Sequence, residues 1–172
     1  MELELRSPVV LAPETFNVLI APSGVLASSL NDHPGLRRIE ALYVCGNYSR
    51  ILDDLDRRFT SLDVRRGFTA HQLLSILKEA YQTLIIFEHD PGIFEGASEM
   101  PEYVGRALKE ASTGSAGSAV LLYSPGTDPY LAEMAKFADR VVVFTDPPRG
   151  VSKRAAKSIR PGPKAQRTLE GF

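Results

Sequence analysis

The segment that most constrains the fold is Thr83–Asp90, where the apolar run Leu84–Phe87 ends abruptly in Glu88, His89 and Asp90. A short unbroken apolar run is typical of a strand that helices cover on both faces, as in a parallel sheet. Open α/β sheets bind ligands in the crevice beyond the carboxyl ends of their strands. This segment is therefore predicted to be a central strand, with its polar end as the first candidate for chemistry.

Strand and helix patterns alternate along the rest of the chain. Further strands are predicted at 16–20, 39–45, 119–123 and 140–144, and helices at 25–30, 49–59, 69–81, 99–111 and 128–138. Such alternation indicates a mostly parallel sheet with helices on both faces. Residues 1–148, called the body below, are predicted to form one three-layer α/β domain, with 1–14 as a lead-in and 61–68 as a connection.

The helix after Phe68 carries the clearest boundary signal. Thr69 and Gln72 have the spacing of a capping box, and Phe68 and Leu73 that of a hydrophobic staple. Asp128 is likewise placed as the N-cap of a later helix, before a proline. The apolar stripes of two helices are predicted to be Leu73, Leu74, Leu77 and Tyr81 in the first, and Tyr103, Val104, Ala107 and Leu108 in the second.

Composition excludes several classes of protein. Cys45 is the single cysteine, which rules out an internal disulfide framework, and its apolar surroundings predict a buried, inert thiol. No apolar stretch approaches the roughly 20 residues that span a bilayer. The acidic start lacks the apolar core of a signal peptide. We therefore expect a cytoplasmic protein without a membrane partner.

Charge divides the chain into two parts. Residues 149–172, called the tail below, contain seven Lys or Arg and one acid, whereas the body contains 13 basic and 20 acidic residues. An acidic body is a poor surface for duplex DNA, because phosphate binding needs clustered positive charge. The tail lacks apolar periodicity, so we expect it to be disordered when free and to be the part that contacts DNA, if any does.

The run Ala21–Leu30 follows the first predicted strand and resembles the phosphate loop of RecA-like ATPases of the RadA and KaiC type. Gly24 and Ser28 occupy the expected glycine and hydroxyl positions, beside Ser23, but Ala27 stands where the family has its lysine. That lysine supplies positive charge to the β and γ phosphates. The resemblance implies a RecA-like P-loop fold whose phosphate loop is degenerate and whose ATP affinity is largely lost.

Glu88 and Asp90 resemble the Walker B position of the same family, where an acid holds magnesium through water. An inactive body without cofactor or catalytic residues is the leading prediction. The alternative is a divergent ATPase that uses ATP and Mg²⁺ with Ser28, Glu88 and Asp90. Beyond His89, only two histidines remain in the chain, too few for a metal-dependent hydrolase, so no metal site is predicted.

The chain ends in Gln166, Leu169 and Phe172, each three residues from the next. Side chains at this spacing form one stripe in a 3₁₀ turn. The pattern resembles the PCNA-interacting peptide, or PIP box, with which replication and repair proteins bind the sliding clamp. The Thr-Leu pair is similar to archaeal examples, although the usual second aromatic is absent. Because a basic segment precedes it, the tail is predicted to dock the protein on PCNA.

Together these patterns predict a non-catalytic accessory protein of DNA replication or repair. In this interpretation the tail binds the sliding clamp and the pseudo-ATPase body binds a further repair protein. A third hypothesis, an interaction domain whose tail has no role, is also open at the level of sequence.

Overall fold

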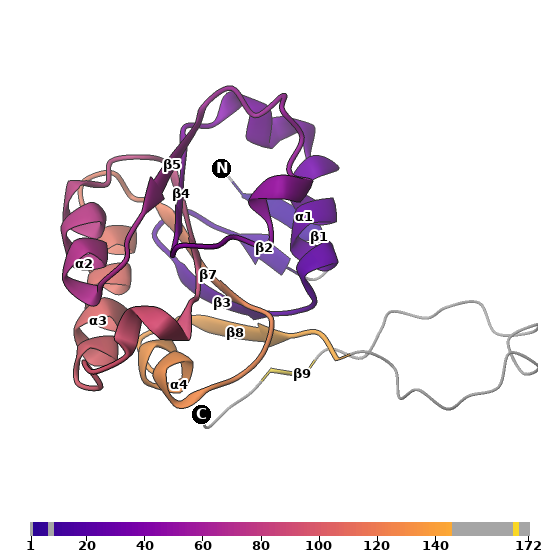
Figure 1. Ribbon diagram of the computed structural model, residues 1–172. Coiled ribbons are helices and arrows are strands. Elements are labelled where there is room, and N and C mark those ends of the chain that lie inside the picture. The colour runs from indigo at the N-terminus through magenta and orange to yellow at the C-terminus, as the bar shows by residue number, and fades with distance from the viewer. Residues whose placement is uncertain (1, 7–8, 146–166, 169–172) are drawn as a thin grey trace, which may run out of the picture.

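The computed structural model describes residues 2–6, 9–145 and 167–168. Its main sheet contains, in spatial order, β5 (Leu62–Arg66), β4 (Ala41–Cys45), β6 (Leu84–Glu88), β7 (Ala119–Ser124), β3 (Phe16–Ile20), β8 (Arg140–Val143) and β9 (Arg167–Thr168) (Figure 1). The first six strands are parallel, and β9 runs antiparallel to β8. The central strand predicted at 84–87 is confirmed as β6.

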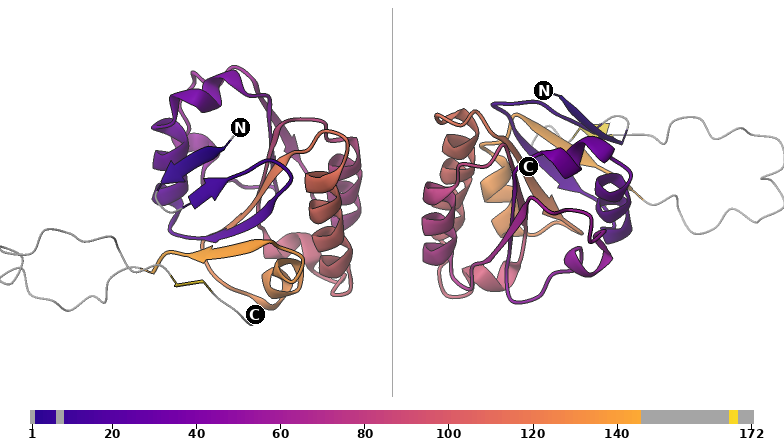
Figure 2. Two further views of the ribbon diagram at one scale, coloured as in Figure 1. Left: turned by 180° about the vertical axis from the view of Figure 1, so that it is seen from behind. Right: turned by 90° about the horizontal axis from the view of Figure 1, so that it is seen from above.

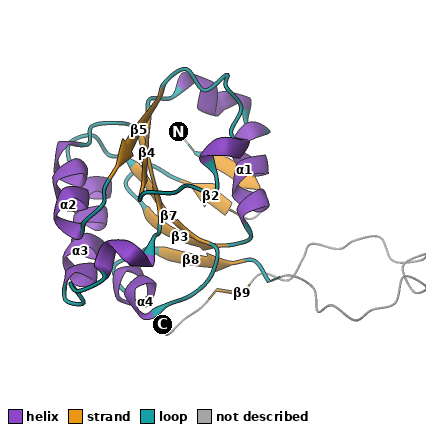
Figure 3. Ribbon diagram, viewed as in Figure 1, coloured by secondary structure: helices purple, strands orange, loops and turns teal. Residues whose placement is uncertain are grey.

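Two layers cover the sheet (Figures 2 and 3). On one face lie α2 (Ala70–Glu79), α3 (Met100–Thr113) and α4 (Pro129–Ala135); on the other lie α1 (Ser23–Asn31) and a hairpin of β1 (Leu3–Arg6) and β2 (Val9–Leu11). Alternate residues of β6 enter different cores, with Ile85 and Phe87 facing α2–α4, and Leu84 and Ile86 facing α1. The predicted three-layer α/β architecture is confirmed.

The start of α2 matches the predicted cap. The Gln72 N–H donates to Thr69 Oγ1 over 3.2 Å, and Gln72 Oε1 accepts from the Phe68 N–H at 2.8 Å. Two aromatic assignments to apolar stripes, Tyr81 and Tyr103, are wrong, however, and Phe68 of the predicted staple is also exposed. Phe68, Tyr81 and Tyr103 are 55%, 66% and 58% exposed. Phe68 precedes the N-cap of α2 and Tyr81 follows its C-cap, so neither belongs to the buried face of that helix.

The helix predicted at 49–59 is also wrong. The structure has only the 3₁₀ turn η2 (Leu52–Asp54) there. Asn31, at the end of α1, explains the early stop: its Nδ2 donates to the Asp54 carbonyl and its Oδ1 accepts from the Asp56 N–H. These long-range bonds occupy backbone groups that a longer helix would use.

Three strands of the body, β5, β1 and β2, were not predicted from the sequence. β5, within the predicted connection, carries Asp63, Arg65 and Arg66, and this polar composition hides a strand at the edge of the sheet. The β1–β2 hairpin lies within the predicted lead-in and buries Leu5 and Leu11 against the α1 face. Two further 3₁₀ turns, η1 (Pro34–Arg38) and η3 (Pro91–Phe94), complete the described elements.

The tail enters the structure at two residues. Gln166, Leu169 and Phe172 of the predicted clamp motif lie outside the described residues. Arg167 and Thr168, between Gln166 and Leu169, form β9. The predicted disorder of the tail stays a prediction. No helix in the described ranges is long and apolar enough to cross a membrane.

Candidate functional site

The connections of the sheet diverge between β4 and β6. The chain leaves β4 toward β5 on one side and leaves β6 toward β7 on the other. Such a switch point opens a crevice at the carboxyl ends of the strands. A crevice of about 420 Å³ lies at this edge. Its lining comes from the segments after β4, β6 and β7: Tyr48, Arg50, Glu88, His89, Asp90, Pro91, Ser124, Pro125, Gly126, Thr127 and Asp128.

Glu88 ends β6 and is buried, with 5% of the residue exposed. Its Oε2 accepts from the Tyr43 hydroxyl at 2.6 Å and from Ser49 Oγ, while its Oε1 accepts from the Arg50 N–H at 2.8 Å. Burial, together with the Glu88 carboxylate, raises the pKa of Tyr43 well above its ordinary value, so this phenol stays a donor. The carboxylate thus ties β6 to β4 and to the loop after β4.

Asp90 lies beside this network, half-buried at the start of η3. Its Oδ1 accepts from the Gly92 N–H at 2.9 Å. Its other oxygen rests against Gly46, where any Cβ would collide with the carboxylate. The structure therefore brings both predicted acids, Glu88 and Asp90, to the crevice, but each already accepts at least one hydrogen bond from a protein group.

His89 joins β6 to the loop after β7. The His89 side chain is 1% exposed, and its Nε2 lies 2.6 Å from Asp128 Oδ2. Burial lowers the pKa of His89, and the Asp128 carboxylate offsets only part of that effect. The neutral ring then donates through Nε2 to Asp128, which leaves Nδ1 without a partner among the described residues.

The predicted N-cap at Asp128 is confirmed, because its Oδ1 accepts from the Leu131 N–H at 2.9 Å. Sequence reasoning nevertheless missed its pairing with His89. The available signal was that both residues follow carboxyl ends of central strands, but only the adjacency of β6 and β7 brings them together.

The residues predicted to form a degenerate phosphate loop lie outside this crevice. Ala21 and Pro22 alone separate β3 from α1, and none of Ser23, Gly24, Ala27 or Ser28 is among the described residues that line the crevice. Ala27 is buried in the core beneath α1, so the position expected for a lysine faces apolar side chains.

The hydroxyl and glycine of this turn also have local roles. Ser28 Oγ donates to the Gly24 carbonyl at 2.6 Å, within α1. Gly24 itself lacks the positive φ that favours glycine, and a Cβ there would meet no atom within 4 Å. The three residues of the alternative ATPase reading are therefore held in separate hydrogen-bond networks, with Ser28 in α1 and Glu88 and Asp90 at the end of β6.

No group of three or more His, Cys, Asp or Glu within the described ranges has the arrangement of a metal site. The basic residue that lines the crevice is Arg50, against the acids Glu88, Asp90 and Asp128.

Cys45 is fully buried, as predicted, and burial raises the pKa of its thiol. A thiol of this kind is a poor nucleophile.

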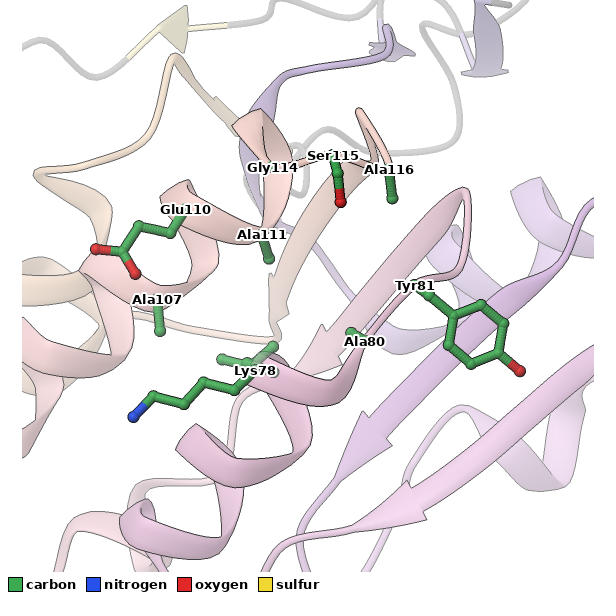
Figure 4. A pocket seen from close by; sticks show the side chains of 10 residues that line it. Lys78, Ala80, Tyr81, Ala107, Glu110, Ala111, Gly114, Ser115 and Ala116 are labelled. Atoms are coloured by element: carbon green, nitrogen blue, oxygen red, sulfur yellow. The ribbon is translucent and has the colours of Figure 1, made fainter.

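A second hollow, of about 300 Å³, lies where α2 and α3 end, on the side of the sheet where the parallel strands begin (Figure 4). Lys78 of α2 and Glu110 of α3 line it, together with small residues such as Ala107 and Ala111. Its side chains form no acid–base or ligand constellation comparable to the pairs in the crevice. The crevice at the carboxyl edge is therefore the better candidate site.

Comparison with known proteins finds no family model that matches the chain. Among curated proteins, one from Archaeoglobus fulgidus is 49% identical to this chain over 80 residues, and its function is uncharacterized. The alignment covers 46% of this chain and 40% of that protein, so the chain matches less than half the length of its relative.

Proposed function

We propose that this protein is a non-catalytic accessory factor of DNA replication or repair that binds the PCNA sliding clamp through its tail. The observation that carries the proposal is the spacing of Gln166, Leu169 and Phe172 at the end of a basic segment. A glutamine, an aliphatic and an aromatic side chain on one stripe suit a shallow apolar pocket, and the basic segment suits an acidic surface or a DNA backbone.

The body is proposed to be a RecA-like scaffold that has lost nucleotide chemistry. The order of elements supports this class: β3 leads directly into α1, and the capped α2 lies between β5 and the acidic end of β6. Loss of chemistry is supported by the buried Ala27 and by the Glu88 carboxylate, which already accepts three hydrogen bonds from protein groups. In this proposal the body presents its surface to another repair protein.

Calorimetry of the full-length protein against an archaeal sliding clamp tests the proposal. We expect micromolar or tighter binding, and a loss of at least about tenfold in affinity for the double variant Leu169→Ala, Phe172→Ala, because anchoring side chains carry most of the energy of such interfaces. Glu170→Ala is the matched control, since it changes a residue between the anchors and should bind like the unmodified chain.

Absence of heat at high micromolar clamp would contradict the clamp assignment. Equal binding by the double variant would show that the contact lies elsewhere, and the body would then be the part to examine.

A further inference from the structure

The two edges of the main sheet differ in how they avoid unwanted pairing. At one edge, β5 carries Asp63, Arg65 and Arg66, and charges of this kind protect an exposed strand from other chains. The edge strand at the other end of the parallel set, β8, has the sequence Arg140-Val141-Val142-Val143 and no charge beyond its first residue. Such an uncharged, β-branched edge favours the addition of another strand.

The strand that the structure adds to β8 is the chain's own C-terminal segment. Val142 lies opposite Thr168 and Val143 lies opposite Arg167, in antiparallel register. Figure 1 shows β9 beside the end of β8. Residues 167 and 168 are the two positions between Gln166 and Leu169, so the docked strand lies inside the proposed clamp motif.

The backbone of β8 shows which pair carries hydrogen bonds. The Phe144 N–H donates to the Ile20 carbonyl of β3. Because backbone groups alternate along a strand, those of Val142 also face β3, whereas those of Val143 face β9. Val143 and Arg167 are therefore the hydrogen-bonded pair, and Val142 and Thr168 the closer, non-hydrogen-bonded pair.

We infer that the β8 edge is a docking site for the chain's own clamp motif, and that docking there and binding to the clamp exclude each other. The inference rests on the proposed clamp function. Arg167 and Thr168 are extended when paired with β8, whereas the stripe of Gln166, Leu169 and Phe172 needs a 3₁₀ turn through the same two residues. One segment cannot hold both conformations at once, so the clamp must compete with β8.

A reversible crosslink tests the exclusion. Cysteines replacing Val142 and Thr168 should form a disulfide, because residues opposite each other in a non-hydrogen-bonded pair have Cα atoms about 4.5 Å apart, within the range that disulfides span. The native Cys45 is buried and should not interfere. We expect the reduced double variant to bind the clamp and the oxidised one to lose at least about tenfold in affinity, since its motif is held in the excluded conformation.

Docking itself is measured without the clamp, by the rate of disulfide formation in redox buffer. The matched control pairs Val142→Cys with Ser158→Cys, which lies in the same tail outside the β9 register. We expect the 142/168 pair to oxidise at least about tenfold faster than the control, in a monomeric product, because docking raises the local concentration of the two thiols. A second variant, Val143→Pro, removes the N–H that faces β9 and keeps those that face β3, and should bind the clamp at least twofold more tightly.

Equal oxidation rates for the two cysteine pairs would overturn the docking site. Disulfide-linked dimers would overturn docking within one chain and make the occupant a second copy. Oxidised protein that binds the clamp as well as reduced protein would overturn the exclusion. If reduced and unmodified proteins both fail to bind the clamp, the proposed function fails, and the oxidation rates still decide whether the tail docks on β8.

Discussion

At the scale of single residues, we expect substitution of Glu88 to be costly for the stability of the body. Both of its oxygens accept hydrogen bonds in a buried network. In Glu88→Gln an amide NH₂ group replaces one of the two oxygens. This group is a hydrogen-bond donor, and it would face the donors from which that oxygen accepts. We expect this change to lower the free energy of unfolding by about 2–4 kcal/mol, measured by urea denaturation.

Asp90→Asn is the matched control for Glu88→Gln. Asp90 is partly exposed, and its Oδ1 accepts from Gly92 in a geometry that an asparagine keeps. Its effect should stay within about 0.5 kcal/mol. A Glu88→Gln variant as stable as this control would show that the network does not hold the two strands.

His89 should give the body a pH-dependent stability. Its folded-state pKa lies below its ordinary value because of burial, so the unfolded chain takes up the proton first as the pH falls. The contribution is fully present above about pH 6.5 and is lost as the pH falls toward the folded-state pKa, by at most about 1.4 kcal/mol per pH unit. Urea denaturation between pH 7.5 and 5 measures this loss.

Two variants isolate the histidine from other titrating groups. His89→Gln should reduce the slope of stability with pH, whereas His71→Gln, at an exposed position of α2, should keep the slope of the unmodified chain. Identical slopes for all three proteins would assign the pH dependence to groups other than His89.

At the scale of elements, two helical glycines make opposite predictions. A Cβ at Gly105 of α3 would lie 2.6 Å from the Phe137 ring and 3.0 Å from Met134 Cα, where α3 packs on α4. Gly24 of α1 has open space around it. We expect Gly105→Ala to destabilise the protein by about 1–3 kcal/mol through overpacking, and Gly24→Ala to stabilise it by up to about 1 kcal/mol through helix propensity. Thermal denaturation of both variants measures the contrast, and a stabilised Gly105→Ala would mean that α4 can move away.

At the scale of the whole molecule, two regions with different chemistry lie at different places on the main sheet. The crevice opens at the carboxyl edge between β4 and β6, whereas the proposed strand-docking site is the β8 end of the same sheet. The acidic charge lies in the body and the basic charge in the tail. In the proposed function, the clamp binds the tail, whereas the second partner binds the body. Only the clamp therefore competes with β8 for the C-terminal motif.

The sequence by itself determined those features whose cause is local. The apolar runs of β3, β4, β6, β7 and β8 predicted buried parallel strands, because a strand covered on both faces is apolar at most of its positions. The caps at Thr69 and Asp128 were predictable for the same reason, since each side chain binds a backbone group a few residues away. The clamp motif is also a local pattern, and it stays a prediction.

Only the tertiary structure decided the features that depend on neighbours distant in sequence. The order of strands places Tyr43 and Ser49 beside Glu88, and Asp128 beside His89. It also pairs the polar β5 with β4 and sets β9 against β8. Each of these contacts joins groups that are far apart in the sequence and that could equally well be hydrogen-bonded to water. No local pattern could therefore indicate them. In the sequence, the candidate site is visible only as polar residues at the ends of predicted strands. The hydrogen-bonded crevice that they form depends on the order of the strands in the sheet.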